Sequence, residues 1–262
     1  MSLLEYQRAL AELAARPDLC RGIRQGEAAA LDAWDLTPRE RARVEASVRH
    51  AGWAVNCTLY RANRLGPIYT LLPRSCFLLG DRFRDEAERF WTLHPRPDFM
   101  TRREIPRFAG YLQDRLREGA IDDPYLGEVL PYELASFELG LMPRRQLTEE
   151  TPVHAWVAPG TPLRLHPVVR LLAFSHDPEP MLAALARFEA GPRDWARGEF
   201  YLLLDGRRES RQMARVDPAL GRLLRQVAEH GKAPDEPRVA ELLAAGYLVP
   251  ALEPRAARAV AV

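Results

Sequence analysis

Lysine is nearly absent from this sequence: Lys232 is the one lysine among 37 basic residues, and all the others are arginine. Such a bias is typical of a GC-rich genome, although arginine also offers planar, bidentate contacts to carboxylates and to the peptide backbone. The 36 acidic residues reduce the formal net charge to +1. A chain without a strong field of one sign does not attract nucleic acid or an anionic membrane by charge, so we expect neither as a partner.

Cysteine and long apolar runs are also scarce. Cys20, Cys57 and Cys76 are odd in number and have no metal-like spacing, which predicts reduced thiols in a cytoplasmic protein. No segment approaches the roughly 20 consecutive apolar residues that span a bilayer. Because Glu5 stands early in a start without a long apolar run, we expect no signal peptide and a cytoplasmic location.

Motifs for catalysis are missing as well. The sequence has neither a Gly-x-Ser-x-Gly nucleophile elbow nor a glycine-rich phosphate loop. His94 precedes a proline, which is more typical of a helix end than of a metal ligand. A zinc or iron site could be drawn from His154, His166 and His176, but no spacing selects it. We therefore predict no catalytic residue, no metal ligand and no cofactor in the chain itself.

The size and composition predict a globular protein of two domains, since the chain has 262 residues, of which 47% are hydrophobic and 28% charged. The first half is predicted to be helical. We expect helices near residues 3–15, 67–79, 81–93, 101–118 and 124–139, and a longer one from Thr37–Pro38 to Arg64 that Gly66–Pro67 interrupts. Thr37 with Glu40, and Thr101 with Glu104, have the spacing of a capping box.

The composition changes after Leu141. Residues 142–160 are rich in proline, threonine and charge and are interpreted as a connection. Strands are expected within 163–174 and at 199–204, followed by a return near Gln212, helices from Asp217–Pro218 and across 239–245, and a last strand at 247–249. Strand, helix, helix, strand of this size is the pattern of a winged-helix unit. We predict an α+β fold, with an all-helical domain at 1–141 and a winged-helix-like α/β domain at 161–262.

A series of motifs runs through residues 59–139. It includes Leu59-Tyr60-Arg61-Ala62-Asn63-Arg64, Phe90-Trp91, His94-Pro95-Arg96-Pro97 and Pro124-Tyr125-Leu126-Gly127-Glu128-Val129. In order and spacing, this region resembles the accessory family that includes MbnC of methanobactin biosynthesis, TglI of 3-thiaglutamate biosynthesis and the HvfC-type proteins. Residues 1–36 match nothing in that pattern.

The resemblance implies a non-catalytic partner of a multinuclear non-haem iron-dependent oxidase. The iron and the oxygen chemistry would belong to the oxidase. The accessory protein would present a ribosomally made, cysteine-containing precursor peptide to it. The second domain would then act like the recognition element of systems that make ribosomally synthesised, modified peptides (a RiPP recognition element) and bind the leader part of the precursor.

Candidate docking residues lie in the helical domain. Aromatic side chains beside a proline-rich segment are typical interface anchors, so we assign Trp91, His94, Arg96 and Phe99 to the surface that docks the oxidase. Arg61 and Arg64 either contact the oxidase or fix the fold through ion pairs, with Glu133 as a candidate partner. The cost of an unpaired buried charge favours the second interpretation.

Candidate peptide-binding residues lie in the second domain. They are Phe200, Tyr201, Leu202, Leu203 and Leu204 of the predicted strand, and Arg222 and Arg225 of the helix after Asp217. A strand at a sheet edge has free backbone groups that can accept the leader as an added strand, and the arginines suit acidic leader residues.

The alternative function is a DNA-binding transcriptional regulator, since winged helices often bind DNA. A recognition helix should be dense in arginine with few acids. The helix that carries Arg222 and Arg225 also carries Glu229, and the net charge is balanced. A stand-alone enzyme is a third possibility, which the missing catalytic motifs disfavour.

Overall fold

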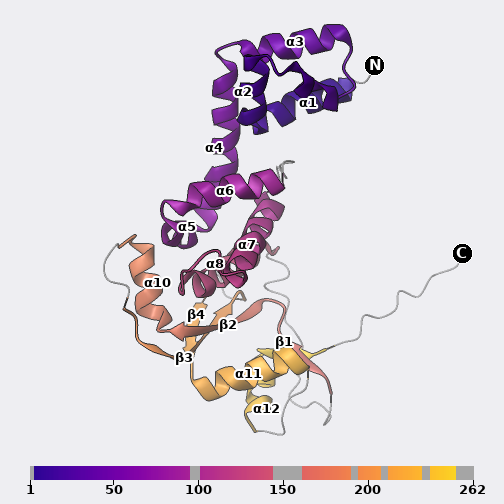
Figure 1. Ribbon diagram of the computed structural model, residues 1–262. Coiled ribbons are helices and arrows are strands. Elements are labelled where there is room, and N and C mark those ends of the chain that lie inside the picture. The colour runs from indigo at the N-terminus through magenta and orange to yellow at the C-terminus, as the bar shows by residue number, and fades with distance from the viewer. Residues whose placement is uncertain are drawn as a thin grey trace, which may run out of the picture. The chain divides into compact units, whose positions relative to one another are not determined.

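The computed structural model describes residues 3–94, 101–143, 161–189, 194–207, 212–231 and 237–251. Its fold is mixed α+β and mostly helical, with two small antiparallel sheets (Figure 1), which confirms the expected class at that level. The chain divides into two compact units, Met1–Asp122 (unit 1) and Asp123–Val262 (unit 2). None of the described helices combines the length and the apolar character that a membrane span requires.

In its described residues, unit 1 is built from helices. They are α1 (Leu3–Ala15), α2 (Pro17–Gln25), the 3₁₀ helix η1 (Ala28–Ala33), α3 (Pro38–Arg49), α4 (Trp53–Leu71), α5 (Pro73–Leu79), α6 (Arg82–Leu93) and α7 (Thr101–Arg117). The start of α3 confirms the predicted capping box. Thr37 Oγ1 accepts from the Glu40 backbone N–H at 3.3 Å, and Glu40 Oε2 accepts from the Thr37 backbone N–H at 2.9 Å.

The long helix predicted from Thr37 to Arg64 breaks in a different place. α3 ends at Arg49, and α4 begins at Trp53 and continues through Gly66–Pro67 to Leu71. Proline lacks the helical N–H and its ring crowds the carbonyl four residues earlier, which is why the sequence predicts a break there. Arg64 and Ile68 are both buried on the inner face of α4, so tertiary packing holds the helix across its proline.

Two groups of buried side chains stabilise unit 1. The first joins α1, α2, α3 and the start of α4 through Ala9, Leu13, Cys20, Ile23, Leu31, Trp34, Val44, Val48 and Cys57. In the second, the ring of Phe90 on α6 lies 5.2 Å from that of Phe108 and 5.6 Å from that of Tyr111, both on α7. The later part of α4 packs against α5 and α7, so α4 takes part in both groups.

Unit 2 combines helices with the two sheets. In its described residues, the elements are α8 (Leu126–Leu141), β1 (Leu163–Leu165), β2 (Val169–His176), α10 (Pro178–Ala186), β3 (Arg197–Asp205), β4 (Gln212–Val216), α11 (Pro218–His230), α12 (Pro237–Ala244) and β5 (Leu248–Pro250). β1 pairs with β5, and the other strands form an antiparallel sheet in the order β2-β3-β4.

α8 belongs to unit 2, whereas the predicted helical domain extends to residue 141. The Asp-Pro signal does start this helix, because Asp123 Oδ1 accepts from the N–H groups of Tyr125 and Leu126, each at 2.9 Å. α8 then packs on β2, and its residue Leu139 shares a core with Leu204 of β3. The division therefore falls before α8, at Asp122/Asp123.

The sheet β2-β3-β4 lies between helices on both faces (Figure 1). Successive side chains of a strand point to opposite faces. Leu204 accordingly packs with α8, while Leu203 packs with Leu223 and Leu224 of α11. A strand buried on both faces needs a nearly continuous apolar run, which is what residues 200–204 supply.

Gly221 marks the closest approach of α11 to this sheet. A Cβ atom at this position would overlap the ring of Tyr201 on β3, and Tyr201 is itself buried. The missing side chain therefore lets α11 lie directly on β3.

We expect Gly221→Ala to destabilise the protein by about 1–3 kcal/mol. Overpacking against the Tyr201 ring should outweigh the roughly 1 kcal/mol that alanine gains over glycine within a helix. Gly110→Ala in α7 is the control, because a Cβ there meets nothing within 4 Å, and it should raise stability. Urea unfolding followed by circular dichroism measures both changes. Equal stabilisation by the two substitutions would contradict the close contact.

Candidate functional site

Strand β3 is the middle strand of its sheet. Leu203 lies opposite Leu171 of β2 on one side and opposite Ala214 of β4 on the other. Both neighbours accompany β3 from Tyr201 to Asp205. This corrects the position expected for an added strand, because the space directly beside residues 201–204 is already filled. The open edges of the sheet belong to β2 and β4.

The predicted peptide-binding side chains of β3 are turned into the core. Tyr201, Leu202, Leu203 and Leu204 are all buried, and Phe200 is half-buried. The backbone of these residues holds β2 and β4 in place, and their side chains contact the helices on both faces of the sheet. Contact with a peptide would therefore come from the neighbouring strand, whose side chains the sequence analysis did not select.

The direction of the backbone groups on each edge follows from one hydrogen bond. The Gly206 N–H donates to the Val168 carbonyl at 2.9 Å, and the register places these two residues opposite each other. Hydrogen-bonded and non-bonded pairs alternate along an antiparallel ladder. Even-numbered residues of β3 therefore point their N–H and C=O groups to β2, and odd-numbered residues such as Leu203 point theirs to β4.

The same alternation decides which backbone groups of β4 are open. Ala214 is the partner of Leu203, so its N–H and C=O face β3. Those of Met213 and Arg215 face away from the sheet. Within the described residues, neither makes a backbone hydrogen bond to another element. As far as the described part of the chain goes, β4 thus has an open edge, and its residues 213–215 are exposed.

The outer edge of β2 is partly closed. Val169 donates its N–H to the His166 carbonyl at 2.9 Å, and its own carbonyl accepts from the Arg170 guanidinium at 3.1 Å. At the other end, the His176 N–H donates to Glu128 Oε2 at 3.4 Å. Because neighbouring groups already use these positions, β4 is the better candidate for strand addition.

Two side chains flank the open edge on one face of the sheet. Met213 is 44% exposed and offers an apolar surface. The Arg215 guanidinium lies 3.2 Å from Asp177 Oδ2 and 4.8 Å from the centre of the Phe200 ring. An ion pair and a cation–π contact together hold this arginine in place.

The predicted arginines of α11 are exposed and already paired. Arg222 binds Glu199, and Arg225 Nε lies 2.7 Å from Glu229 Oε1. The hydrogen bond with Glu229 raises the pKa of Arg225. Exposed ion pairs contribute little to stability, so exchange for a carboxylate of a ligand is feasible at both positions.

The predicted docking residues of unit 1 have different environments. The Trp91 ring is buried, with the Arg64 guanidinium 5.1 Å from its centre. It is therefore part of the interior and not an exposed anchor, which corrects that assignment. His94 is exposed and packs on Phe90 at 4.8 Å between ring centres. Arg96 and Phe99 lie outside the described residues.

The side chain above Trp91 belongs to a buried ion pair. Arg64 of α4 donates to Glu104 of α7 through Nε at 2.9 Å and through Nη2, and each side chain is 6% exposed. The Glu104 carboxylate thus serves this pair. Arg61 lies 3.3 Å from Glu88 of α6. The fold-fixing interpretation of Arg64 therefore has a structural basis, with Glu104 as its partner in place of the expected Glu133.

A surface cleft of about 440 Å³ lies between α6 and α7. Its walls are formed by Arg89, Thr92, Leu93, Tyr111, Asp114, Arg115 and Glu118. Behind it, the buried Glu86 accepts from Tyr111 Oη and from Arg115 at 3.2 and 3.3 Å. Burial, with the hydrogen bond to Glu86, raises the pKa of Tyr111 to about 12. The phenol stays protonated at neutral pH, so Tyr111 serves as a hydrogen-bond donor to Glu86.

A cluster of polar side chains lies where β2 packs against α8 and consists of Ser175, His176 and Glu128. The His176 Nδ1 atom lies 2.9 Å from Glu128 Oε1 and 3.3 Å from Ser175 Oγ, and Ser175 also binds Glu128. In a hydrolytic triad the serine and the acid bind opposite nitrogens of the imidazole. Here both share Nδ1, so the cluster ties β2 to α8 and does not activate a nucleophile.

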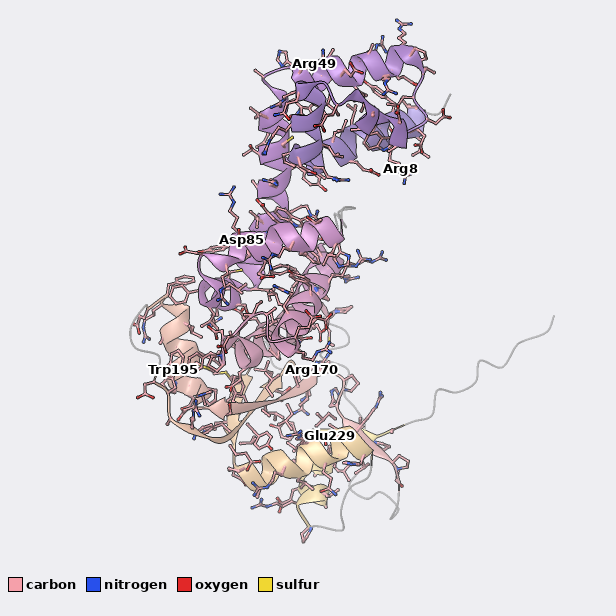
Figure 2. All side chains as sticks on the ribbon, in the orientation of Figure 1. Arg8, Arg49, Asp85, Arg170, Trp195 and Glu229 are labelled. Atoms are coloured by element: carbon pink, nitrogen blue, oxygen red, sulfur yellow. The ribbon has the colours of Figure 1, made fainter. Side chains whose placement is uncertain are left out.

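Aromatic rings enclose this cluster. Tyr125 lies 4.8 Å from His176 and 4.6 Å from Trp195, which is labelled in Figure 2. Over the described ranges, no three His, Cys, Asp or Glu side chains are grouped to hold a metal ion. His154 lies outside those ranges.

No family model matches this chain, and no curated protein sequence matches it.

The ion pair of Arg64 and Glu104 yields a stability prediction. Arg64→Met or Glu104→Leu alone should destabilise the protein by about 3–5 kcal/mol, because each leaves a buried charge unpaired, and the double substitution should recover most of that loss. Glu88→Gln is the control at the more exposed pair. Urea unfolding measures all four variants. Additive losses in the double variant would contradict a coupled pair.

His166 yields a prediction on pH. Burial lowers the pKa of this imidazole, and its Nδ1 accepts from the Val168 N–H at 3.3 Å, which requires the neutral ring. A pKa below the unfolded value near 6.5 means that the contribution is complete above about pH 6.5 and declines as the pH falls. Thermal unfolding at pH 7.5 and 5.5 should show a smaller pH-dependent loss for His166→Asn than for the wild type. Identical losses would mean that His166 is not coupled to folding.

Proposed function

We propose that this chain is a non-catalytic accessory subunit that binds a ribosomally made precursor peptide and presents it to a multinuclear non-haem iron-dependent oxidase. The observation that carries the peptide-binding half is the open edge of β4, on a sheet whose two faces are already covered. The resemblance of residues 59–139 to the accessory proteins of such oxidases supports the other half. The iron would reside in the partner, and this chain would need no cofactor of its own.

Strand addition suits a leader peptide because the affinity comes mainly from backbone hydrogen bonds. The outward groups of Met213 and Arg215 would pair with an extended segment of the leader. Selectivity would come from the side chains on that face, with an apolar leader residue beside Met213 and an acidic one beside Arg215. A charge on an edge strand also discourages indiscriminate pairing, so Arg215 would select as well as attract.

The arrangement of unit 2 is compatible with a recognition element. The order β4, α11, α12, β5 is the strand, helix, helix, strand pattern of a winged-helix unit, which we propose for this part of the chain. In such a unit the added peptide strand would extend the sheet from three strands to four. α11 would lie under one face of the sheet and close to the new strand, since it begins directly after β4.

The DNA-binding alternative finds little support in the charges of α11. Its exposed Arg222 and Arg225 are paired with Glu199 and Glu229. A helix that reads DNA needs arginines available to phosphates and bases.

We place the complex in the cytoplasm, where ribosomal precursors are made. The free thiols of Cys20, Cys57 and Cys76 fit a reducing compartment. The gene neighbourhood is the first test of the proposal. We expect an iron-oxidase gene and a short gene for a cysteine-containing precursor beside the gene of this chain, and the oxidase should co-purify with the chain. Neighbours of unrelated function and no co-purification would contradict the proposal.

The proposed peptide site leads to a prediction that depends on which residues of β4 point their backbone groups away from the sheet. Met213→Pro should leave the fold intact and reduce leader binding at least tenfold, because it removes an N–H that points outward. Ala214→Pro should instead destabilise the sheet, because it removes an N–H that bonds to β3. Titration of the fluorescently labelled leader, with micromolar affinity expected for the wild type, measures binding. Thermal unfolding measures the fold.

Arg215→Gln is the matched test of selectivity, since it keeps the backbone of β4 and removes the charge. It should weaken the binding of a leader that has an acidic residue and leave unchanged the binding of a leader in which an amide replaces that residue. Undiminished binding to a folded Met213→Pro variant would exclude the β4 edge. A labelled DNA duplex serves as the competitor, and tighter binding of the duplex would favour the regulator.

A further inference from the structure

The solvent-facing side of α4 carries no charged residue. The exposed positions of this helix are Ala54, Val55, Asn56, Thr58, Leu59, Ala62, Asn63, Gly66, Tyr69 and Thr70; we call them the outer face of α4. Charged residues make up 28% of the chain, and other helices of unit 1 expose many of them, among them Arg49 on α3 and Asp85 on α6 (Figure 2). Depletion of charge with apolar residues at the centre is the composition of an interface core.

The apolar positions of the outer face form one continuous stripe. Val55, Leu59, Ala62, Gly66 and Tyr69 follow each other at intervals of three or four residues, so they lie along a single line of the helix. Val55, Leu59 and Tyr69 are 56%, 55% and 53% exposed. Side chains of this kind, lined up along a helix about 28 Å long, form an exposed apolar strip.

The two charged residues of α4 point away from this strip. Arg64 is buried against Glu104, and Arg61 lies beside Glu88 of α6. The strip therefore has no charge of its own that would repel an identical strip. A partner of opposite charge would find nothing on it to attract.

The side chains along the stripe have sizes that would complement those of a second, identical stripe related by a two-fold axis. Its centre lies between Ala62 and Asn63, and a two-fold axis at that point would place Leu59 of one copy opposite Gly66 of the other. The bulky Leu59 side chain then meets a position without a side chain. The space above Gly66 is free, since a Cβ added there meets no atom within 4 Å. The rotation repeats this contact at the symmetry-related position, and Val55 falls opposite the region of Tyr69. Such matching of one patch with itself is the requirement for a two-fold dimer.

We propose that the outer face of α4 binds a second copy of this chain, with the two α4 helices packed antiparallel around a two-fold axis near Ala62. The contact buries the uncharged stripe of each copy, with Leu59 inserted over Gly66. The inference does not depend on the proposed function, because it uses no peptide and no oxidase.

The mass of the purified full-length chain in solution tests the proposal. Light scattering behind size exclusion should give twice the 29.7 kDa of the chain at micromolar concentration. Leu59→Arg should reduce it to that of the single chain. Ala46→Arg on the exposed side of α3 is the control and should leave the dimer unchanged. Circular dichroism should show the same helix content in all of these variants.

An exchange of sizes separates the specific contact from general stickiness. Gly66→Leu and Leu59→Ala should each weaken the dimer at least tenfold, since one fills the gap and the other removes the group that enters it. The double variant Leu59→Ala/Gly66→Leu should restore dimerisation, while Gly66→Ala should have little effect. A single-chain mass for the wild type at every concentration would overturn the proposal. So would a dimer that survives Leu59→Arg. If Leu59→Arg instead removes co-purification with the iron oxidase from a chain that is always single, the outer face of α4 belongs to that enzyme and the second copy is excluded.

Discussion

From Tyr201 to Asp205, strand β3 is bonded on both edges and covered on both faces, and unit 2 is arranged around this constraint. Its backbone is used by β2 and β4, and its side chains are used by α8 and by α11. From Tyr201 to Asp205, nothing of β3 is left for a ligand. Any recognition by the sheet must therefore take place on its neighbours, whose own positions are fixed by β3. A central strand held in this way fixes the register of β4.

In unit 1 the comparable constraint is the pairing of Arg64 with Glu104. Three elements meet there, since Arg64 belongs to α4, Glu104 to α7 and the Trp91 ring beside them to α6. A buried pair of this kind adds little net stability over an apolar substitute, but it penalises every arrangement that separates its members. Rings such as Phe90 and Phe108 supply apolar contact area between α6 and α7.

Most elements could be predicted from the sequence because their signals are local. The Thr37 capping box, the Asp123-Pro124 start of α8 and the apolar run of β3 each depend on a few neighbouring residues. The passage of α4 through Pro67 could not be predicted, because buried contacts of Arg64 and Ile68 outweigh a local preference. The central place of β3 was equally inaccessible. A run that is apolar at every position indicates burial on both faces, yet it does not say which strands lie beside it.

The candidate site shows the same limit. The residues of β3 have the strongest strand propensity, whereas the open backbone groups belong to Met213 and Arg215, which have no distinctive pattern. Their role depends on which residues of β4 point their N–H and C=O groups outward, and the pairing of β4 with β3 decides that. Trp91 was misplaced for a related reason, since an aromatic residue near prolines has the same sequence signature whether its ring faces the solvent or an arginine.

The continuity of α4 has a further consequence for how unit 1 opens. One end of the helix supplies Cys57 to the cluster that contains Leu13 of α1, and the other end supplies Arg64, which pairs with Glu104 of α7. Because a single helix is shared by the two clusters, the loss of packing in one of them destabilises the other. Amide groups along the middle of α4 should then exchange with solvent only in openings that involve both clusters, so unit 1 behaves as one cooperative body in its slowest fluctuations.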